Sequence, residues 1–115
     1  MNLDSLTERS KGFLQAAQTI ALRDNHQQVM SFHLLKALLD DSEGQAGRLI
    51  EAAGGDAKRA LALSDRALSK VPGVEGSNSQ MYISQDLAKV VDQAEQLSKK
   101  AGDSFVTVEY LLLAL

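Results

Sequence analysis

Residues 94–115 read AEQLSKKAGDSFVTVEYLLLAL, and residues 17–38 read AQTIALRDNHQQVMSFHLLKAL. Aligned without gaps, at an offset of 77 residues, the two stretches share alanine, valine or leucine at six positions. Each stretch holds the end of one helical pattern, a short polar turn and the start of a second apolar helix. We therefore predict an internal duplication of a helix, a turn and a helix. The identical pairs are Ala17 and Ala94, Val29 and Val106, Leu34 and Leu111, Leu35 and Leu112, Ala37 and Ala114, and Leu38 and Leu115.

The rest of the chain extends this pattern to an all-α fold of six helices. Apolar residues recur every three to four positions, and the expected helices end at glycine, proline or a polar pair. Two helices open with the spacing of a capping box, at Ser5 and at Ser42, and Asp56, Ser84 and Thr107 are expected to cap three others. The expected helices span about 5–24, 31–40, 42–53, 56–71, 84–101 and 107–115.

The offset of 77 residues also predicts how the chain is divided. We expect a first repeat over about residues 1–71, a loop rich in Gly, Ser and Asn over about 72–80, and a partial second repeat over about 81–115. At the same offset, a complete second copy would continue to about residue 148. The second repeat is therefore expected to be truncated.

Composition and charge exclude several classes of function. The 115 residues include 12 Lys and Arg against 15 Asp and Glu, and this net charge of −3 gives no electrostatic reason to bind nucleic acid or an anionic membrane. The absence of cysteine excludes thiol catalysis and disulfides and agrees with a reducing compartment. No apolar run approaches the roughly 20 residues that span a bilayer, and the start MNLDSLTERS does not resemble a signal peptide. We expect one soluble, cytoplasmic domain.

The sequence offers no constellation for catalysis or metal binding. The nucleophile-elbow, phosphate-loop and dinucleotide-binding motifs are absent. His26 and His33 are expected on different elements, as ordinary helix-end or partly buried residues and not as metal ligands. Asp40, Asp41 and Glu43 lie between two expected helices and are interpreted as solvated capping residues. We therefore expect no enzyme activity, no metal and no cofactor in this chain.

Apolar residues near helix starts favour a binding module instead. Phe32 and Tyr110 stand off the apolar stripes, at the starts of the second and sixth expected helices. Asp103 and Glu109 flank the turn before the sixth helix, where a structural role and a binding role are both open. A small helical domain with spare apolar groups suits the binding of peptides or exposed hydrophobic segments.

The run AEQLSKKAGDSFVTVEYLL at 94–112 closely resembles the N-terminal domain of the ClpB disaggregases. The resemblance extends in register over the whole chain. The phrase GDSFVTVE at 102–109 separates the chain from the ClpA and ClpC relatives, whose corresponding domains dock adaptor proteins, and adaptor docking is the alternative function. The other matching segments are TER at 7–9, ALR at 21–23, HQQ at 26–28, HLL at 33–35, LDD at 39–41 and AGGD at 53–56.

This resemblance implies a monomeric Clp N-domain with two pseudo-repeated four-helix motifs. A flexible linker would attach it to two AAA+ ATPase modules, absent here, that bind ATP and magnesium and assemble as a hexameric ring. The parent chaperone would extract polypeptides from aggregates together with the DnaK system, and the N-domain would capture unfolded or aggregated chains. The family's polar residues are matched at Thr7, Asp103 and Glu109, beside an implied hydrophobic groove that includes Leu97 and Tyr110.

The chain departs from the family pattern at two places. Family members usually have Thr-Pro-Glu-His at the start of the second helix, where this chain has Met30, Ser31, Phe32 and His33. We expect Ser31 to replace the usual cap and Phe32 to add apolar surface that contacts a hydrophobic client. At Tyr110 the family often has a basic or apolar residue, so the chemistry of the groove is open at this position.

Overall fold

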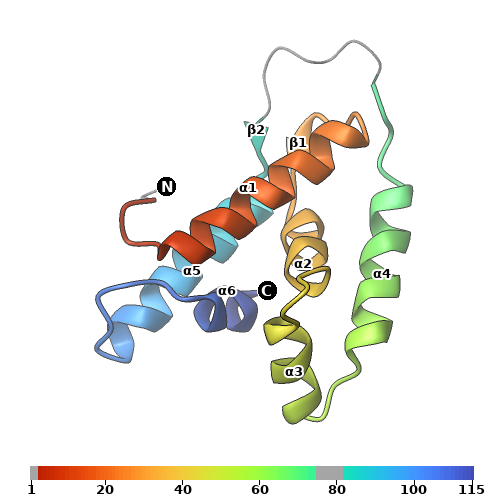
Figure 1. Ribbon diagram of the computed structural model, residues 1–115. Helices are drawn as coiled ribbons and strands as arrows, with labels where there is room; N and C mark the ends of the chain where they lie inside the picture. The colour runs from red at the N-terminus through yellow and green to blue at the C-terminus, as the bar shows by residue number, and fades with distance from the viewer. Residues whose placement is uncertain (1–2, 75–81) are drawn as a thin grey trace.

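The computed structural model describes residues 3–74 and 82–115, and in this part of the chain it contains six helices and two very short strands (Figure 1). The all-α prediction is confirmed, whereas the strands were not predicted. Residues 75–80 of the expected loop lie outside the described residues. None of the described helices is long and apolar enough to cross a membrane. In chain order the elements are α1 (Glu8–Arg23), β1 (Gln28–Val29), α2 (Ser31–Leu39), α3 (Gln45–Ala52), α4 (Ala57–Ser69), β2 (Tyr82–Ile83), α5 (Gln85–Lys100) and α6 (Val108–Ala114).

Residues 77 positions apart take equivalent places in the structure. α1 and α5 both begin and end at this offset, and α2 and α6 begin at it. The N-caps Thr7 and Ser84 each accept a hydrogen bond from the backbone N–H three residues later. Both long helices are followed by a left-handed residue, Asn25 with φ of 58° and Gly102 with φ of 81°. The duplicated helix, turn and helix is thus visible in the structure, while the bounds of the repeats stay a prediction.

Short parallel pairings join the two equivalent units. β1 pairs with β2, which places Val29 opposite Ile83, and an isolated parallel bridge joins Leu6 to Val106. At the offset of 77, Leu6 corresponds to Ile83 and Val29 corresponds to Val106. The two bridges are therefore equivalent, and each connects one unit to the other. Because each unit contributes the same two residues to the two bridges, the units are related by a pseudo-two-fold arrangement, in which α1 corresponds to α5.

Apolar side chains from both units form one core. Ala17, Ala94, Leu34 and Leu111 all have no exposed surface, as their equivalent positions predict. The last predicted pair differs, because Leu38 is fully buried whereas Leu115 is 38% exposed. α2 packs against both α1 and α4, whereas α6 packs mainly against α5 and has no counterpart of α4 in the described part of the chain. The largest fully buried apolar side chains are Leu34, Leu38, Leu87, Val91, Val106 and Leu111.

Two helix starts differ from the capping-box prediction. α1 is capped by Thr7 and not by Ser5, because the residue before Thr7 is held extended in the bridge to Val106. α3 follows Gly44, whose φ of 67° is left-handed, so Ser42 does not cap this helix. The expected caps Asp56, Ser84 and Thr107 do occupy the N-cap positions of α4, α5 and α6.

The start of α2 also differs from the expectation. Met30 is its N-cap and Ser31 its first helical residue, so Ser31 does not replace the family's cap. The capping bond comes from the helix itself, since the backbone N–H of Met30 donates to Nδ1 of His33 at 2.8 Å. An acceptor at the third helical position thus performs half of the capping-box function.

Candidate functional site

Thr7 is fixed by hydrogen bonds to both units. Its backbone N–H donates to the carbonyl oxygen of Val106 at 3.1 Å, and its hydroxyl accepts from the N–H of Ser10 at 3.1 Å. The buried Ser10 hydroxyl donates to the same Val106 oxygen at 2.9 Å. Thr7 therefore caps α1 and holds the start of this helix against the segment that leads into α6.

Asp103, Glu109 and Tyr110 surround that same segment, on either side of Val106. The Tyr110 hydroxyl donates a hydrogen bond to the Asp103 carboxylate. This bond, some desolvation and the negative charges of Asp103 and Glu109 raise the pKa of Tyr110 above its ordinary value. The structure thus gathers Thr7, Asp103, Glu109 and Tyr110 around the turn between α5 and α6, and both carboxylates are exposed.

Leu97 lies on α5, half-buried, with polar neighbours. It borders a shallow depression whose other lining residues carry amide or ammonium groups. These are Gln93, Gln96, Lys99 and Lys100. An apolar ligand at Leu97 would therefore meet one apolar side chain within a polar surface.

Phe32 lies apart from the turn between α5 and α6. It is 42% exposed in the first turn of α2, and at the offset of 77 it corresponds to Glu109. Thr7 precedes α1 and α2 follows it, and the 16 residues of α1 span about 24 Å. The six predicted residues thus occupy three places: the turn with its four residues, the face of α5 with Leu97, and the start of α2 with Phe32.

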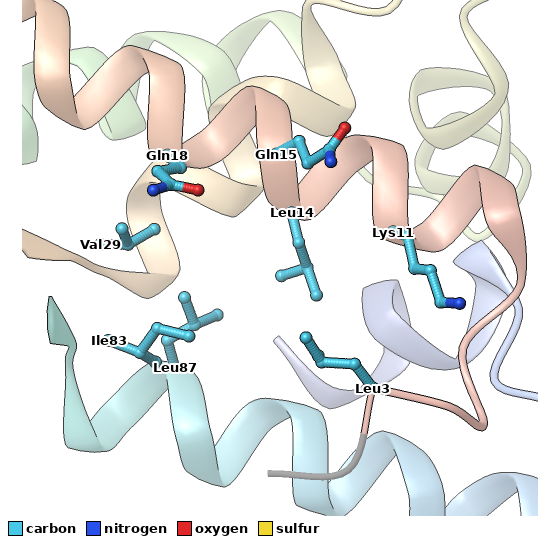
Figure 2. Close-up of a pocket in the computed structure, with 8 residues that line it drawn as sticks. All are labelled: Leu3, Lys11, Leu14, Gln15, Gln18, Val29, Ile83 and Leu87. Atoms are coloured by element: carbon cyan, nitrogen blue, oxygen red, sulfur yellow. The ribbon is translucent and has the colours of Figure 1, made fainter. Parts of the chain in front are cut away.

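An apolar cleft of about 350 Å³ opens between α1, α5 and the paired strands (Figure 2). Figure 2 shows Leu14 pointing from α1 into a space that Ile83, Leu87 and Leu3 approach from the other side. Val29 closes one end, and the remaining lining residues, Lys11, Gln15 and Gln18, are polar and come from α1. This combination of apolar walls and a polar rim is typical of sites that bind apolar groups.

The sequence-based prediction did not include the residues of this cleft. Leu14 carries the spacing of a core position in α1, and Leu3 and Ile83 lie outside the expected helices. These side chains converge because β1 pairs with β2, and strands of two residues have no sequence pattern from which the pairing could be predicted. In the sequence, the available signal was that Leu3 and Ile83 are apolar residues outside the expected helices.

The described residues contain no group of three or more His, Asp or Glu side chains arranged to hold a metal ion. Asp41 and Glu43 instead form ion pairs with Arg9, at 2.9 and 3.2 Å. Together they fasten α1 to the connection between α2 and α3.

The whole chain is similar in sequence to known proteins. It is 58% identical over 115 residues to the chaperone protein ClpB of Agrobacterium fabrum and 56% identical to that of Mesorhizobium japonicum. Each match covers all of this chain and 13% of the relative, so the chain spans about an eighth of the length of the curated relatives it matches. The ClpB of Rickettsia felis is 35% identical over 116 residues and is covered over 14% of its length.

Solved structures show the same fold. The N-terminal domain of Hsp104 from Candida albicans matches with a TM-score of 0.85 at 20% identity, over 96% of this chain and 73% of that one. The N-domain of ClpV from Vibrio cholerae matches with a TM-score of 0.79 at 20% identity, over 97% and 66%. The sequence model of the Clp repeat N-terminal domain matches residues 5–115. On this match, the chain belongs to the Clp repeat N-terminal domain family.

Proposed function

We propose that this domain captures unfolded or aggregated polypeptides for an ATP-dependent AAA+ chaperone. The matches over the full chain to N-terminal regions of ClpB chaperones support this role. In the proposed assembly, AAA+ modules outside this chain bind ATP and magnesium, form a hexameric ring in the cytoplasm and thread the captured chain together with the DnaK system. The domain itself acts as a monomer and has no enzyme activity.

The cleft between α1 and α5 is the observation that carries the proposal. Its walls offer half-exposed apolar groups, including Leu3 and Ile83, and its volume of about 350 Å³ suits one or two large apolar side chains. Amide and ammonium groups of Gln15, Gln18 and Lys11 lie on its rim and suit the backbone of an extended client. An open site of this size binds weakly, which fits a domain that passes its client on.

The proposed contact surface also includes the residues predicted from the sequence. The exposed carboxylates Asp103 and Glu109 face solvent beside Tyr110, where they attract basic groups of a client. Phe32, 42% exposed, adds an apolar contact at the equivalent place in the other unit. The complete predicted set is Thr7, Phe32, Leu97, Asp103, Glu109 and Tyr110.

The equivalence of residues 77 apart supports the proposed division of the chain. Under this division, residues 1–71 form the first repeat, residues 72–80 connect, and residues 81–115 form a partial second repeat. α1 and α2 of the first repeat then correspond to α5 and α6 of the second.

An NMR titration of the 15N-labelled chain with a permanently unfolded protein tests the proposal. We expect fast-exchange shifts at the amides of Leu14, Ile83 and Leu87, with further shifts near Tyr110 and Phe32. Ile83→Gln should weaken binding several-fold. Leu63→Gln is the matched control, because Leu63 is 48% exposed against 45% for Ile83 but lies on α4, away from the cleft.

The outcomes separate the alternatives. Shifts confined to α4 would contradict the cleft and the predicted residues alike. Binding of a folded adaptor protein with no response to unfolded chains would assign the domain to the adaptor-docking function of ClpA and ClpC relatives.

A further inference from the structure

The two histidines of the chain contact each other in the interior. His26 follows α1 and His33 lies in the first turn of α2, with β1 between them. Nδ1 of His26 lies 2.8 Å from Nε2 of His33, and the side chains are buried, with exposed fractions of 4% and 0%. The pair therefore fastens the end of one helix to the start of the next.

The hydrogen bonds fix the protonation state of both rings. A backbone N–H can only donate, so Nδ1 of His33, which accepts from Met30 at 2.8 Å, carries no proton. The proton of neutral His33 is then on Nε2, which donates to Nδ1 of His26. A second proton on either ring would set two donors against each other, at Met30 or between the rings. The hydrogen bond from Met30 to His33 and the hydrogen bond from His33 to His26 therefore both require neutral histidines.

Charged groups from four elements surround the pair. Asp24 caps the end of α1 and Asp86 lies in the first turn of α5, and both favour a protonated His33. Lys36 of α2 opposes protonation and is paired at 2.7 Å with Asp65 of α4. Burial is the largest influence and, with His26 and Lys36, lowers the pKa of His33 to about 4.

We propose that the His26–His33 pair is a proton-sensitive latch, which holds the start of α2 closed at neutral pH and releases it on acidification. Release frees the cap at Met30 and loosens β1, whose Val29 carbonyl oxygen accepts from the N–H of Ser84 at 3.0 Å. The proposal rests on the two rings and stands independently of the proposed client binding.

The chain contains its own control for this latch. At the offset of 77, His26 and His33 correspond to Asp103 and Tyr110, which also hydrogen bond to each other. A carboxylate and a phenol do not change charge between about pH 5 and 8. The bond from Thr7 to Val106, at 3.1 Å, is the equivalent of the bond from Ser84 to Val29 and should not respond to pH.

Amide hydrogen exchange of the 115-residue chain at pH 8 and pH 5, expressed as protection factors, tests the latch. When opening returns His33 alone to the ordinary histidine pKa of 6.5, opening becomes about 30-fold more favourable at pH 5 than at pH 8. Protection of Met30 and Ser84 should fall by about that factor, whereas protection of Thr7 should hold. Ring 15N shifts should show His33 neutral at pH 6, with its proton on Nε2.

Two variants separate the latch from general destabilisation. His26→Asn keeps a side-chain acceptor near the position of Nδ1 and should preserve protection of Met30 at pH 8, whereas His26→Leu should lose it. If His26→Leu does not fold, the protection factors and ring 15N shifts of the unaltered chain are sufficient to test the latch. Titration of His33 near pH 6.5, or equal loss of protection at Thr7 and Ser84, would overturn the proposal.

Discussion

Asp86, in the first turn of α5, lies beside Ser31, the first residue of α2, and hydrogen bonding from Ser31 helps to lower the pKa of the Asp86 carboxyl. The same carboxylate accepts from the hydroxyl of Ser84 and, at 2.9 Å, from the backbone N–H of Leu87. One side chain therefore satisfies donors at the start of α5 and lies beside the start of α2, where the two equivalent units meet. At the offset of 77 its counterpart is Arg9, so this link belongs to one unit alone.

We expect Asp86→Asn to destabilise the domain by about 1 kcal/mol at pH 7, the usual value of a lost helix cap. Burial raises the pKa of Asp86, but hydrogen bonds from Ser84 and Ser31 outweigh it, so the pKa lies below the ordinary 3.8. The carboxylate therefore stabilises the fold above about pH 4, and this contribution is lost as the pH falls further. Urea unfolding at pH 7 and pH 3 checks this, and an equal difference between variant and parent at both pH values would contradict it.

Two glycines should respond in opposite directions to alanine. A Cβ at Gly55 would lie 2.7 Å from Cγ2 of Ile50 and 3.2 Å from its carbonyl oxygen, so Gly55→Ala should destabilise by about 1–2 kcal/mol. A Cβ at Gly12, inside α1, meets nothing within 4 Å, and Gly12→Ala should stabilise by about 0.5–1 kcal/mol through helix propensity. Thermal unfolding measures both, and a Gly55→Ala variant as stable as the parent would show that Ile50 yields without cost.

Arg9→Ala should destabilise more than an ordinary surface substitution. The Arg9 guanidinium binds Asp41 at 2.9 Å and Gln45 at 3.0 Å and lies 5.2 Å from the centre of the Phe13 ring. A network of this kind is worth about 1 kcal/mol, whereas Lys11→Ala, which removes a single exposed pair with Glu8, should cost less than about 0.5 kcal/mol. Equal losses in urea unfolding would mean that the network adds nothing to an isolated ion pair.

Phe32→Glu should leave stability within about 0.5 kcal/mol and weaken client binding. The side chain is 42% exposed, so little apolar contact is lost, while a charge replaces the proposed apolar contact. Leu63→Glu, on α4, provides the matched exposed control. Urea unfolding and the NMR titration measure the two effects, and a large loss of stability would show that Phe32 belongs to the core.

The alkaline titration of Tyr110 should depend on Asp103. The Asp103 carboxylate accepts a hydrogen bond from the Tyr110 hydroxyl, which favours the neutral phenol. This bond raises the pKa of Tyr110 above 10.0. Asp103→Asn removes a charge and should move the titration toward lower pH. Ultraviolet absorbance of the two tyrosines follows this change, and Tyr110→Phe identifies the affected group. An unchanged titration in Asp103→Asn would show that the bond is not formed in solution.

The sequence determined the local features of this fold. Three-to-four spacing of apolar residues, the stops at Gly54 and Gly102 and the cap at Ser84 depend on neighbours along the chain, and these occur where they were predicted, unlike the caps expected at Ser5, Ser31 and Ser42. The offset of 77 residues likewise required only a comparison of the chain with itself. Even the family could be identified this way, because its motifs are contiguous.

Tertiary structure alone decided which groups meet across the two units. The shift of the first cap from Ser5 to Thr7 follows from the bridge between Leu6 and Val106, 100 positions apart in the chain. The approach of Ser31 to Asp86 and the cleft beside Ile83 also join the two units, whereas the contact of His26 with His33 follows from the packing of α2 against α1 within one unit. Backbone pairing and burial set these contacts once the helices pack, and no periodicity of a single segment encodes the position of its distant partner.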